Sequence, residues 1–338
     1  MGTPVYNDTQ CAEAAETVRN VWYMLPSLFS FVSSVTCIIL VVQGYRKYQF
    51  RQEYHVNTKI LVSLNMASNF IFSCATSGNY GLLLINTMLA VEDCDFLFTT
   101  PSCSIIRCLF FFTTMLNSLT HIALICERSY AVYKLYEYEN KGESFGVFLA
   151  TASIIGSMIT VMMVTWNEDQ NELLTNCYAF SSCPSISDRV YLMFKVQLAL
   201  ELITYFSCRF ISRIVKQTGQ KCYQLTARFT AVQTMAVLND ITPLYSTSSA
   251  IVAVYIGFTH FGYYLRPHMS LPHYKQLASW IFILPHHALI TMILYCYFFR
   301  NQVKGKEDRL KDTLTSSSRL EKGYNYQMWM DWDARLRD

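Results

Sequence analysis

The sequence predicts an all-α membrane protein, built as a bundle of seven transmembrane helices. Two observations carry this prediction. Only 15% of the 338 residues are charged and 52% are apolar, whereas soluble domains carry about 25% charged residues. The apolar residues also gather into long runs, as a bilayer core requires of a helix of roughly 20 residues. This composition excludes intrinsic disorder, and the lack of a dominant basic domain argues against binding to nucleic acid.

Seven such runs follow one another along the chain. The expected spans are Trp22–Tyr45, Ile60 to about Gly81, Cys103–Cys126, Phe145–Trp166, Val190–Ile211, Phe229–Ile256 and Leu277–Phe298. The first, second and fourth hold no charge, and the uncharged stretch of the second continues to Val91. The fifth is the weakest, because Lys195 and Glu201 interrupt it. The predicted organisation is an N-terminal segment (1–21), the seven-helix domain (22–298) and a charged tail (299–338).

Two of the predicted spans contain a proline near the middle. Pro243 lies in the sixth span and Pro285 in the seventh. Proline removes a backbone N–H and clashes with the preceding turn, so both residues are expected to kink or hinge their helices. Because proline is common in membrane helices, a role in packing alone stays open.

The distribution of basic residues predicts the orientation. The tail and the loops after the first, third and fifth spans hold 21 basic residues, against four on the opposite side. Those four are Arg19, Arg189, Arg266 and Lys275. By the positive-inside rule, the N-terminus lies outside and the C-terminus in the cytosol. Asn7-Asp8-Thr9 is an acceptor triplet for N-glycosylation, which fits an outside segment.

Several ionisable residues fall at membrane depth, where each charge costs about 2.5–3.5 kcal/mol. They should therefore face the bundle interior and form pairs. The candidates for lining a ligand cavity are Arg107, Lys195, Glu201, Asp240 and His286. Interhelical pairs that only fix packing remain an alternative, as does snorkelling of Arg107 and Lys195 to the headgroups. His286 and His287 point about 100° apart on a helix, so no metal, cofactor or catalytic site is expected.

Motifs around the third span resemble those of a known receptor family. Cys103 stands at its outer mouth and Glu127-Arg128-Ser129-Tyr130 at its cytosolic end, about 37 Å of helix apart. With Tyr54-His55-Val56-Asn57-Thr58-Lys59 entering the second span and Cys94-Asp95 before the third, the chain resembles the nematode serpentine chemoreceptors. These are G-protein-coupled receptors, and class ab (Srab) or the related class a (Sra) is the nearest. Taken alone, Glu127 and Arg128 could be an ordinary interfacial pair.

The resemblance implies a chemosensory receptor of the plasma membrane, expressed in sensory neurons and without enzymatic activity. It would bind an external small molecule and activate a heterotrimeric G protein, with Glu127, Arg128 and Tyr130 at the coupling site. It also implies a disulfide from Cys103 to the loop after the fourth span. The partner is Cys177, with Cys183 as the rival; Cys94 would form a second bridge with the one left over, and Cys11 would stay unpaired.

Other parts of the chain depart from the large rhodopsin-like class. The second span carries Asn65 and Asn69 instead of an acidic residue, and Pro285 is not followed by the Asn-Pro-x-x-Tyr pattern. The sodium site and tyrosine switch of that class are therefore not transferred. The alternative function is a transporter or channel that uses the intramembrane charges as a relay. The lack of an inverted repeat and of paired interrupted helices argues against it.

Overall fold

The computed structural model describes residues 8–48, 55–134, 137–138, 142–169, 173–178, 186–219, 225–298 and 300. Almost all of this part is helical. The helices are α1 (Asp8–Arg19), α2 (Val21–Tyr48), α3 (Val56–Leu89), α4 (Thr100–Tyr133), α5 (Ser144–Thr165), α6 (Ser187–Gly219), α7 (Leu225–Leu265) and α8 (Leu271–Ile281). Two short 3-10 helices are η2 (Asp93–Phe96) and η5 (Arg266–His268), and two strands are β1 (Phe98–Thr99) and β2 (Leu173–Leu174).

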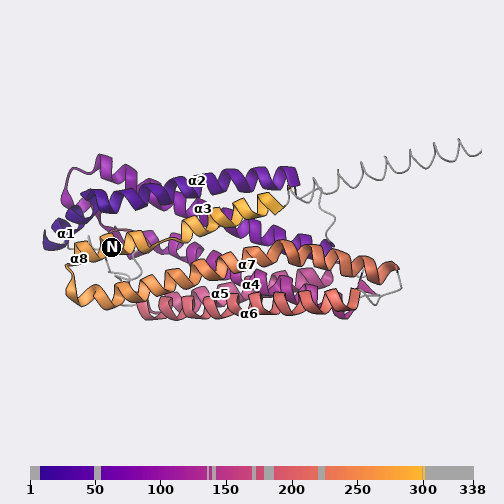
Figure 1. The fold of residues 1–338 in the computed structure, drawn as a ribbon. Helices are drawn as coiled ribbons and strands as arrows, with labels where there is room; N and C mark the ends of the chain where they lie inside the picture. The colour runs from indigo at the N-terminus through magenta and orange to yellow at the C-terminus, as the bar shows by residue number, and fades with distance from the viewer. Residues whose placement is uncertain are drawn as a thin grey trace, which may run out of the picture. The chain divides into compact units, whose positions relative to one another are not determined.

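Six helices in the described part are long and apolar enough to cross a membrane. These are Val21–Arg46, Val56–Leu89, Thr100–Tyr133, Ser144–Thr165, Val237–His268 and Leu271–Phe298. The fifth predicted span falls in α6, which is less apolar but has 33 residues, about 50 Å of helix. The predicted seven-helix bundle is thus confirmed, and the long helices lie side by side (Figure 1).

The observed helices extend beyond the predicted spans. The second ends at Leu89 and the sixth at Leu265, not near Gly81 and Ile256. Neither Gly78 nor Gly81 adopts a positive φ, so these glycines continue the helix. Hydropathy locates the part of a helix that lies in the hydrocarbon core, but it does not predict how many helical turns continue beyond that core.

The central helix of the bundle is α4. It packs against α3, α5, α6 and α7, and its membrane span is the most deeply buried of the six. The buried polar side chains of α4, such as Arg107, His121 and Arg128, therefore contact other parts of the protein and not lipid. This position makes α4 the helix on which the polar groups of the interior can be paired.

Two disulfides stand at the same end of the bundle. Cys103 at the start of α4 is bonded to Cys177, which follows β2, and β1 pairs antiparallel with β2 beside this bond. The second bond joins Cys11 of α1 to Cys94 of η2. This corrects the expectation that Cys94 pairs with Cys183 and leaves Cys11 free: α1 packs on η2 and brings Cys11 to it, while Cys183 lies outside the described residues. We call this end the disulfide end.

The seventh span is interrupted near its middle. Regular helix stops at Ile281 and resumes at residue 284, so that Phe282 and Ile283 are not helical. Pro285 lies in the first turn after the break, where its missing N–H costs no helical hydrogen bond. The other proline, Pro243, is inside the continuous helix α7, and a kink there stays a prediction.

Helices α3 and α5 approach each other closely at Asn57 and Gly146, and this contact can be tested by substitution. A methyl group at Gly146 would lie 2.7 Å from Cα of Asn57, so Gly146→Ala should lower the free energy of unfolding by about 1–3 kcal/mol. Gly257→Ala is the matched control, because nothing lies within 4 Å of the added carbon and alanine favours helix by about 1 kcal/mol. Thermal unfolding in detergent should rank the control above wild type and Gly146→Ala below it. Equal melting temperatures for the two variants would contradict this packing.

Candidate functional site

A pocket lies toward the disulfide end of the bundle, between α2, α3, α6, α7, α8 and the loop after β2. Its volume is about 70 Å³, and one water molecule needs roughly 10–15 Å³ on this measure. Six tyrosines line it: Tyr23, Tyr80, Tyr178, Tyr191, Tyr255 and Tyr274. We call it the tyrosine pocket. Thr259, Ser279 and Asn176 add further polar groups to its wall.

The loop after β2 is fixed over this pocket by α4. The Cys103–Cys177 disulfide joins the two segments. One turn along α4, the fully buried Arg107 donates a hydrogen bond from Nε to the carbonyl oxygen of Cys177 at 3.0 Å and forms an ion pair with Glu168. Tyr178 and Asn176 are thereby held against the helices, and the Asn79 amide donates to Asn176 Oδ1 at 2.8 Å. Arg107 thus anchors the loop and does not itself line the tyrosine pocket.

An aromatic layer closes the inner side of the tyrosine pocket. Phe282 lies at the helix break, and its ring centroid is 5.4 Å from that of Tyr178. Phe110 lies 5.0 Å from Tyr178 and 5.8 Å from Phe282, and Phe72 lies 5.7 Å from Phe110. Aromatic pairs at such distances stabilise the structure by more than the burial of their apolar surface alone. Displacement of any one ring should therefore change the packing of the others.

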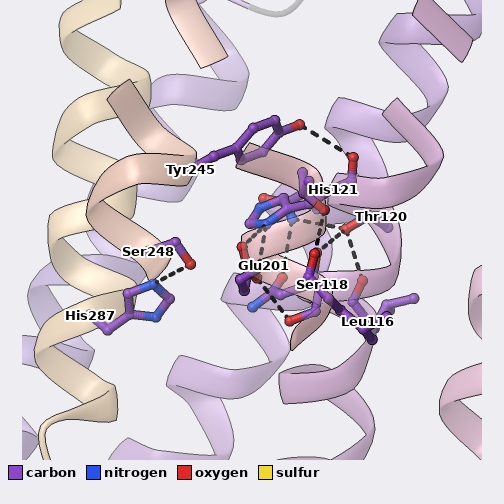
Figure 2. A network of polar contacts seen from close by, with 12 residues as sticks. Leu116, Ser118, Thr120, His121, Glu201, Tyr245, Ser248 and His287 are labelled. Carbon is purple, nitrogen blue, oxygen red and sulfur yellow. Dashed lines mark hydrogen bonds and ion pairs between the residues drawn. The ribbon is translucent and has the colours of Figure 1, made fainter. Parts of the chain in front are cut away.

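A buried polar network lies deeper in the bundle. His121 Nδ1 is 3.1 and 3.2 Å from the two carboxylate oxygens of Glu201, and the Ser118 hydroxyl donates to the same carboxylate at 2.9 Å. The His121 ring also packs 4.7 Å from that of Tyr245. Figure 2 shows these side chains of α4, α6 and α7 meeting at one point. The network therefore ties three helices together at membrane depth.

The two adjacent histidines of the seventh span contact different helices. His287 Nε2 is 3.1 Å from the Ser248 hydroxyl of α7, also drawn in Figure 2, whereas His286 Nδ1 is 2.8 Å from the Ser33 hydroxyl of α2. Together with Asn117, His287 and Glu201 line a cavity of about 20 Å³. No group of three metal-ligating side chains occurs among the described residues.

The predicted ligand-cavity residues do not come together in one cavity. Arg107 anchors a loop, Lys195 is exposed, His286 contacts α2, and only Glu201 lines a cavity, the small deep one. The side chain of Asp240 is outside the described residues. Among the described side chains, the expected residues therefore do not form one ligand cavity, because Arg107, Glu201 and His286 each contact a different neighbour and Lys195 is exposed.

Sequence reasoning missed the residues that do line the tyrosine pocket. It placed Lys275 in an outer loop before the seventh span, but α8 begins at Leu271 with Pro272 in its first turn, so Lys275 is helical and lines the pocket. The tyrosines come from five separate helices and a loop. The richness in aromatic residues, 15% of the chain, was the available signal, but it does not say which rings face one another.

At the opposite end of α4, the expected coupling residues form a closed cluster. Glu127 and Arg128 are fully buried and form an ion pair through Nε and Nη2 of the guanidinium. Arg128 Nη2 also donates to the Thr58 hydroxyl of α3 at 2.7 Å, and Thr58 donates to Glu127 at 3.2 Å. The Tyr138 hydroxyl donates to Glu127 and accepts from Arg128 at 3.2 Å. We call these four residues the arginine cluster.

The environment of Tyr138 keeps its hydroxyl protonated. Burial and the negative charge of Glu127 raise the pKa of Tyr138 above its usual range, so the phenol remains a donor. Its ring packs 4.3 Å from that of His55. Tyr130, the third expected coupling residue, packs on Phe145 of α5 at 4.7 Å, and its ring centroid lies 6.3 Å from that of Tyr138. The Tyr138 ring therefore covers the Arg128 guanidinium, 5.6 Å from the ring centroid.

Comparison with known proteins gives one family and two similar receptors. The model of the family described as serpentine type 7TM GPCR receptor class ab chemoreceptor matches residues 8–328. Serpentine receptor class alpha-39 of Caenorhabditis elegans is 26% identical over 334 residues, which cover 96% of this chain and 88% of that protein. Serpentine receptor class beta-17 of the same organism is 19% identical over 314 residues, covering 90% and 85%.

The pairing of His121 with Glu201 can be tested by a double-mutant cycle. Glu201→Leu and His121→Leu should each destabilise the protein, because each leaves a buried polar partner unsatisfied. The double variant should lose less than the sum of the two losses, with a coupling of about 0.5–3 kcal/mol. Thermal unfolding in detergent measures all three. In the matched cycle, Glu201→Leu combined with replacement of the exposed His268 should be additive, and additivity in the first cycle as well would contradict the pairing.

Proposed function

The chain belongs to the serpentine class ab family of seven-transmembrane chemoreceptors, and we propose that it binds a small external molecule and activates a heterotrimeric G protein. The observation that carries the proposal is that the two ends of the bundle hold two different kinds of site. A small pocket lined by aromatic and hydroxyl groups lies toward one end, and a buried, permanently charged arginine lies at the other. Small-molecule sites are typically concave and mostly apolar, with a few polar groups.

The disulfide end is proposed to face the outside, and the arginine cluster the cytosol. Disulfides persist in oxidising compartments, and the basic residues gather on the opposite side, as the positive-inside rule requires. Of the proposed outside features, Asn7 is a glycosylation acceptor that lies outside the described residues. In this orientation, the tyrosine pocket is reached from the environment and Arg128 from the cell interior. The plasma membrane of sensory neurons is the proposed location.

The closed arginine cluster is proposed to be the resting state. The charge of Arg128 is satisfied by Glu127, Thr58 and Tyr138, so it is not available to a partner. In the active state, the loop that carries Tyr138 would move away and Arg128 would turn toward the G protein. A ligand produces this change only by binding the open conformation more tightly than the closed one.

The path from pocket to cluster is proposed to run through the seventh span and α4. A ligand in the tyrosine pocket would contact Phe282 at the helix break, and the aromatic layer joins Phe282 to Phe110 of α4. The His121–Glu201 pair ties α4 to α6 below this layer. Displacement of the ring layer would therefore alter the contacts of α4 with two neighbouring helices.

A transporter or channel is the less favoured function. A charge relay would need successive ionisable groups along a continuous path. Among the described side chains, Arg107 is closed in an ion pair with Glu168, and Lys195 is exposed on the outer face of α6. Glu201 is likewise occupied by His121. Nucleotide exchange in cells and substrate uptake into vesicles separate the two functions.

The proposed topology predicts which end a protease can reach. In sealed, right-side-out vesicles, a C-terminal epitope tag should be protected from added protease, and a tag at the N-terminus should be removed. Detergent should abolish the protection. The Asn7→Gln variant should lose the mobility shift that glycosidase treatment produces in wild type. Cleavage of the C-terminal tag in intact vesicles would overturn the orientation.

Loss of the countercharge in the arginine cluster should raise basal signalling. Glu127→Gln keeps the size of the side chain but removes the charge that holds Arg128, so nucleotide exchange without ligand should rise, within the range of about 5–150-fold that typical coupling energies allow. Glu137→Gln is the matched control, because Glu137 is an exposed acid on the same loop, paired with Lys134. Unchanged basal exchange in Glu127→Gln would mean that the cluster does not restrain the receptor.

Removal of the arginine should have the opposite effect. Arg128→Ala should abolish ligand-stimulated nucleotide exchange, because the group proposed to contact the G protein is gone. Surface expression and ligand binding should stay near wild type, and surface labelling serves as the control. If Arg128→Ala reaches the surface and still couples normally, the proposed coupling role of this residue is wrong.

A further inference from the structure

We propose that the tyrosine pocket takes a small organic anion, a monocarboxylate with a short apolar body, and that Lys275 pairs with its carboxylate. This inference rests on the receptor function proposed above and names the chemical class of its ligand. It follows from the charge, the wall and the size of the pocket.

Lys275 is the only formally charged residue in the wall of the pocket, as far as the described residues show. Its side chain is partly buried. No ion pair within 4.0 Å connects Lys275 to a carboxylate in the described ranges, although Glu13 of α1 attracts it at longer range. Neither Glu13 nor the exposed Asp188 at the start of α6 lines the pocket. An ammonium group in such a position, with no carboxylate beside it in the pocket wall, can pair with an anion that enters the pocket.

The neighbouring positive charge acts in the same direction. Arg266 lies over the Tyr274 ring, 5.8 Å from its centroid, and Tyr274 is the residue next to Lys275. Two cationic side chains therefore stand at the turn from α7 to α8. A protonated amine in the pocket would be repelled by both charges, whereas a carboxylate would form a charge-assisted hydrogen bond with Lys275.

The remainder of the wall fits a short apolar body. The rings of Tyr80, Tyr178, Tyr255 and Phe282 form one connected set, with centroid separations of 6.0 Å for the first pair and 6.4 Å for the contacts of Phe282 with Tyr80 and Tyr255. A volume of about 70 Å³ corresponds to roughly five to seven water-sized atoms. A branched or linear acid of four to five carbons has about this size.

The test compares three probes of equal body and different charge: 3-methylbutanoate, 3-methylbutanamide and 3-methylbutylamine. The full-length receptor, purified in detergent, is heated with each probe at micromolar to millimolar concentrations. A ligand that binds only the folded state stabilises it by RT ln(1 + [L]/Kd), so at equal concentration the tighter-binding probe raises the unfolding temperature more. The carboxylate should stabilise the wild-type receptor most, the amide less, and the amine not at all.

Lys275→Met should weaken binding of the carboxylate by roughly 10- to 100-fold, the range expected for a lost charge-assisted hydrogen bond. Binding of the neutral amide should change little, which shows that the pocket itself is intact. Lys195→Met is the matched control, because Lys195 is an exposed lysine of the same bundle, and it should leave all three probes unaffected. Lys275→Arg should retain the preference for the anion.

Three outcomes would overturn the assignment: a preference for the amine, an unchanged carboxylate affinity in Lys275→Met, or no stabilisation by the carboxylate up to millimolar concentration. The measurement contains no G protein. Stabilisation by the carboxylate without any effect on nucleotide exchange in cells would therefore support the ligand class while refuting the proposed coupling function.

Discussion

The structure depends on one constraint: the ionisable side chains buried on the central helix α4 need partners inside the bundle. Lipid offers no hydrogen-bond partner, so an unpaired polar group at membrane depth costs several kcal/mol. Arg107, His121 and Arg128 are all buried on α4. Arg107 pairs with Glu168 and with a carbonyl oxygen of the loop, and His121 pairs with Glu201. Arg128 pairs with the other members of the arginine cluster. These pairs fix the loop over the pocket, the contact with α6 and the position of Tyr138.

The same constraint underlies the coupling proposed between the tyrosine pocket and the arginine cluster. A buried ion pair holds a structure together only while its geometry is good, and removal of one partner is costly. In the proposed mechanism, a small displacement at the aromatic layer would be taken up by another pair, because these buried groups are not solvated. The arginine cluster differs from the His121–Glu201 pair, which joins two helices, because one of its members, Tyr138, belongs to a loop. In the proposed mechanism, Tyr138 is the member that moves away.

Much of the fold could be predicted from the sequence, whereas the ligand site could not. Runs of apolar residues located all seven helices, and the spacing between Cys103 and Arg128 placed them at opposite ends of one helix. Local patterns failed where the answer depended on contacts between distant segments. His121 and Glu201 are 80 residues apart, and Cys11 meets Cys94 across 83 residues. The position of Lys275 depended on where α8 begins, two turns ahead of the apolar run.

The central claim is that the arginine cluster holds the loop that carries Tyr138 closed over Arg128 at rest. Double electron–electron resonance tests it most directly, with spin labels at Glu137 of that loop and Lys216 of α6, both solvent-facing, in a background without the exposed Cys74 and Cys126. Wild type should give one short distance, and Glu127→Gln should add a population at longer distance. Identical distance distributions in the two proteins would contradict the account.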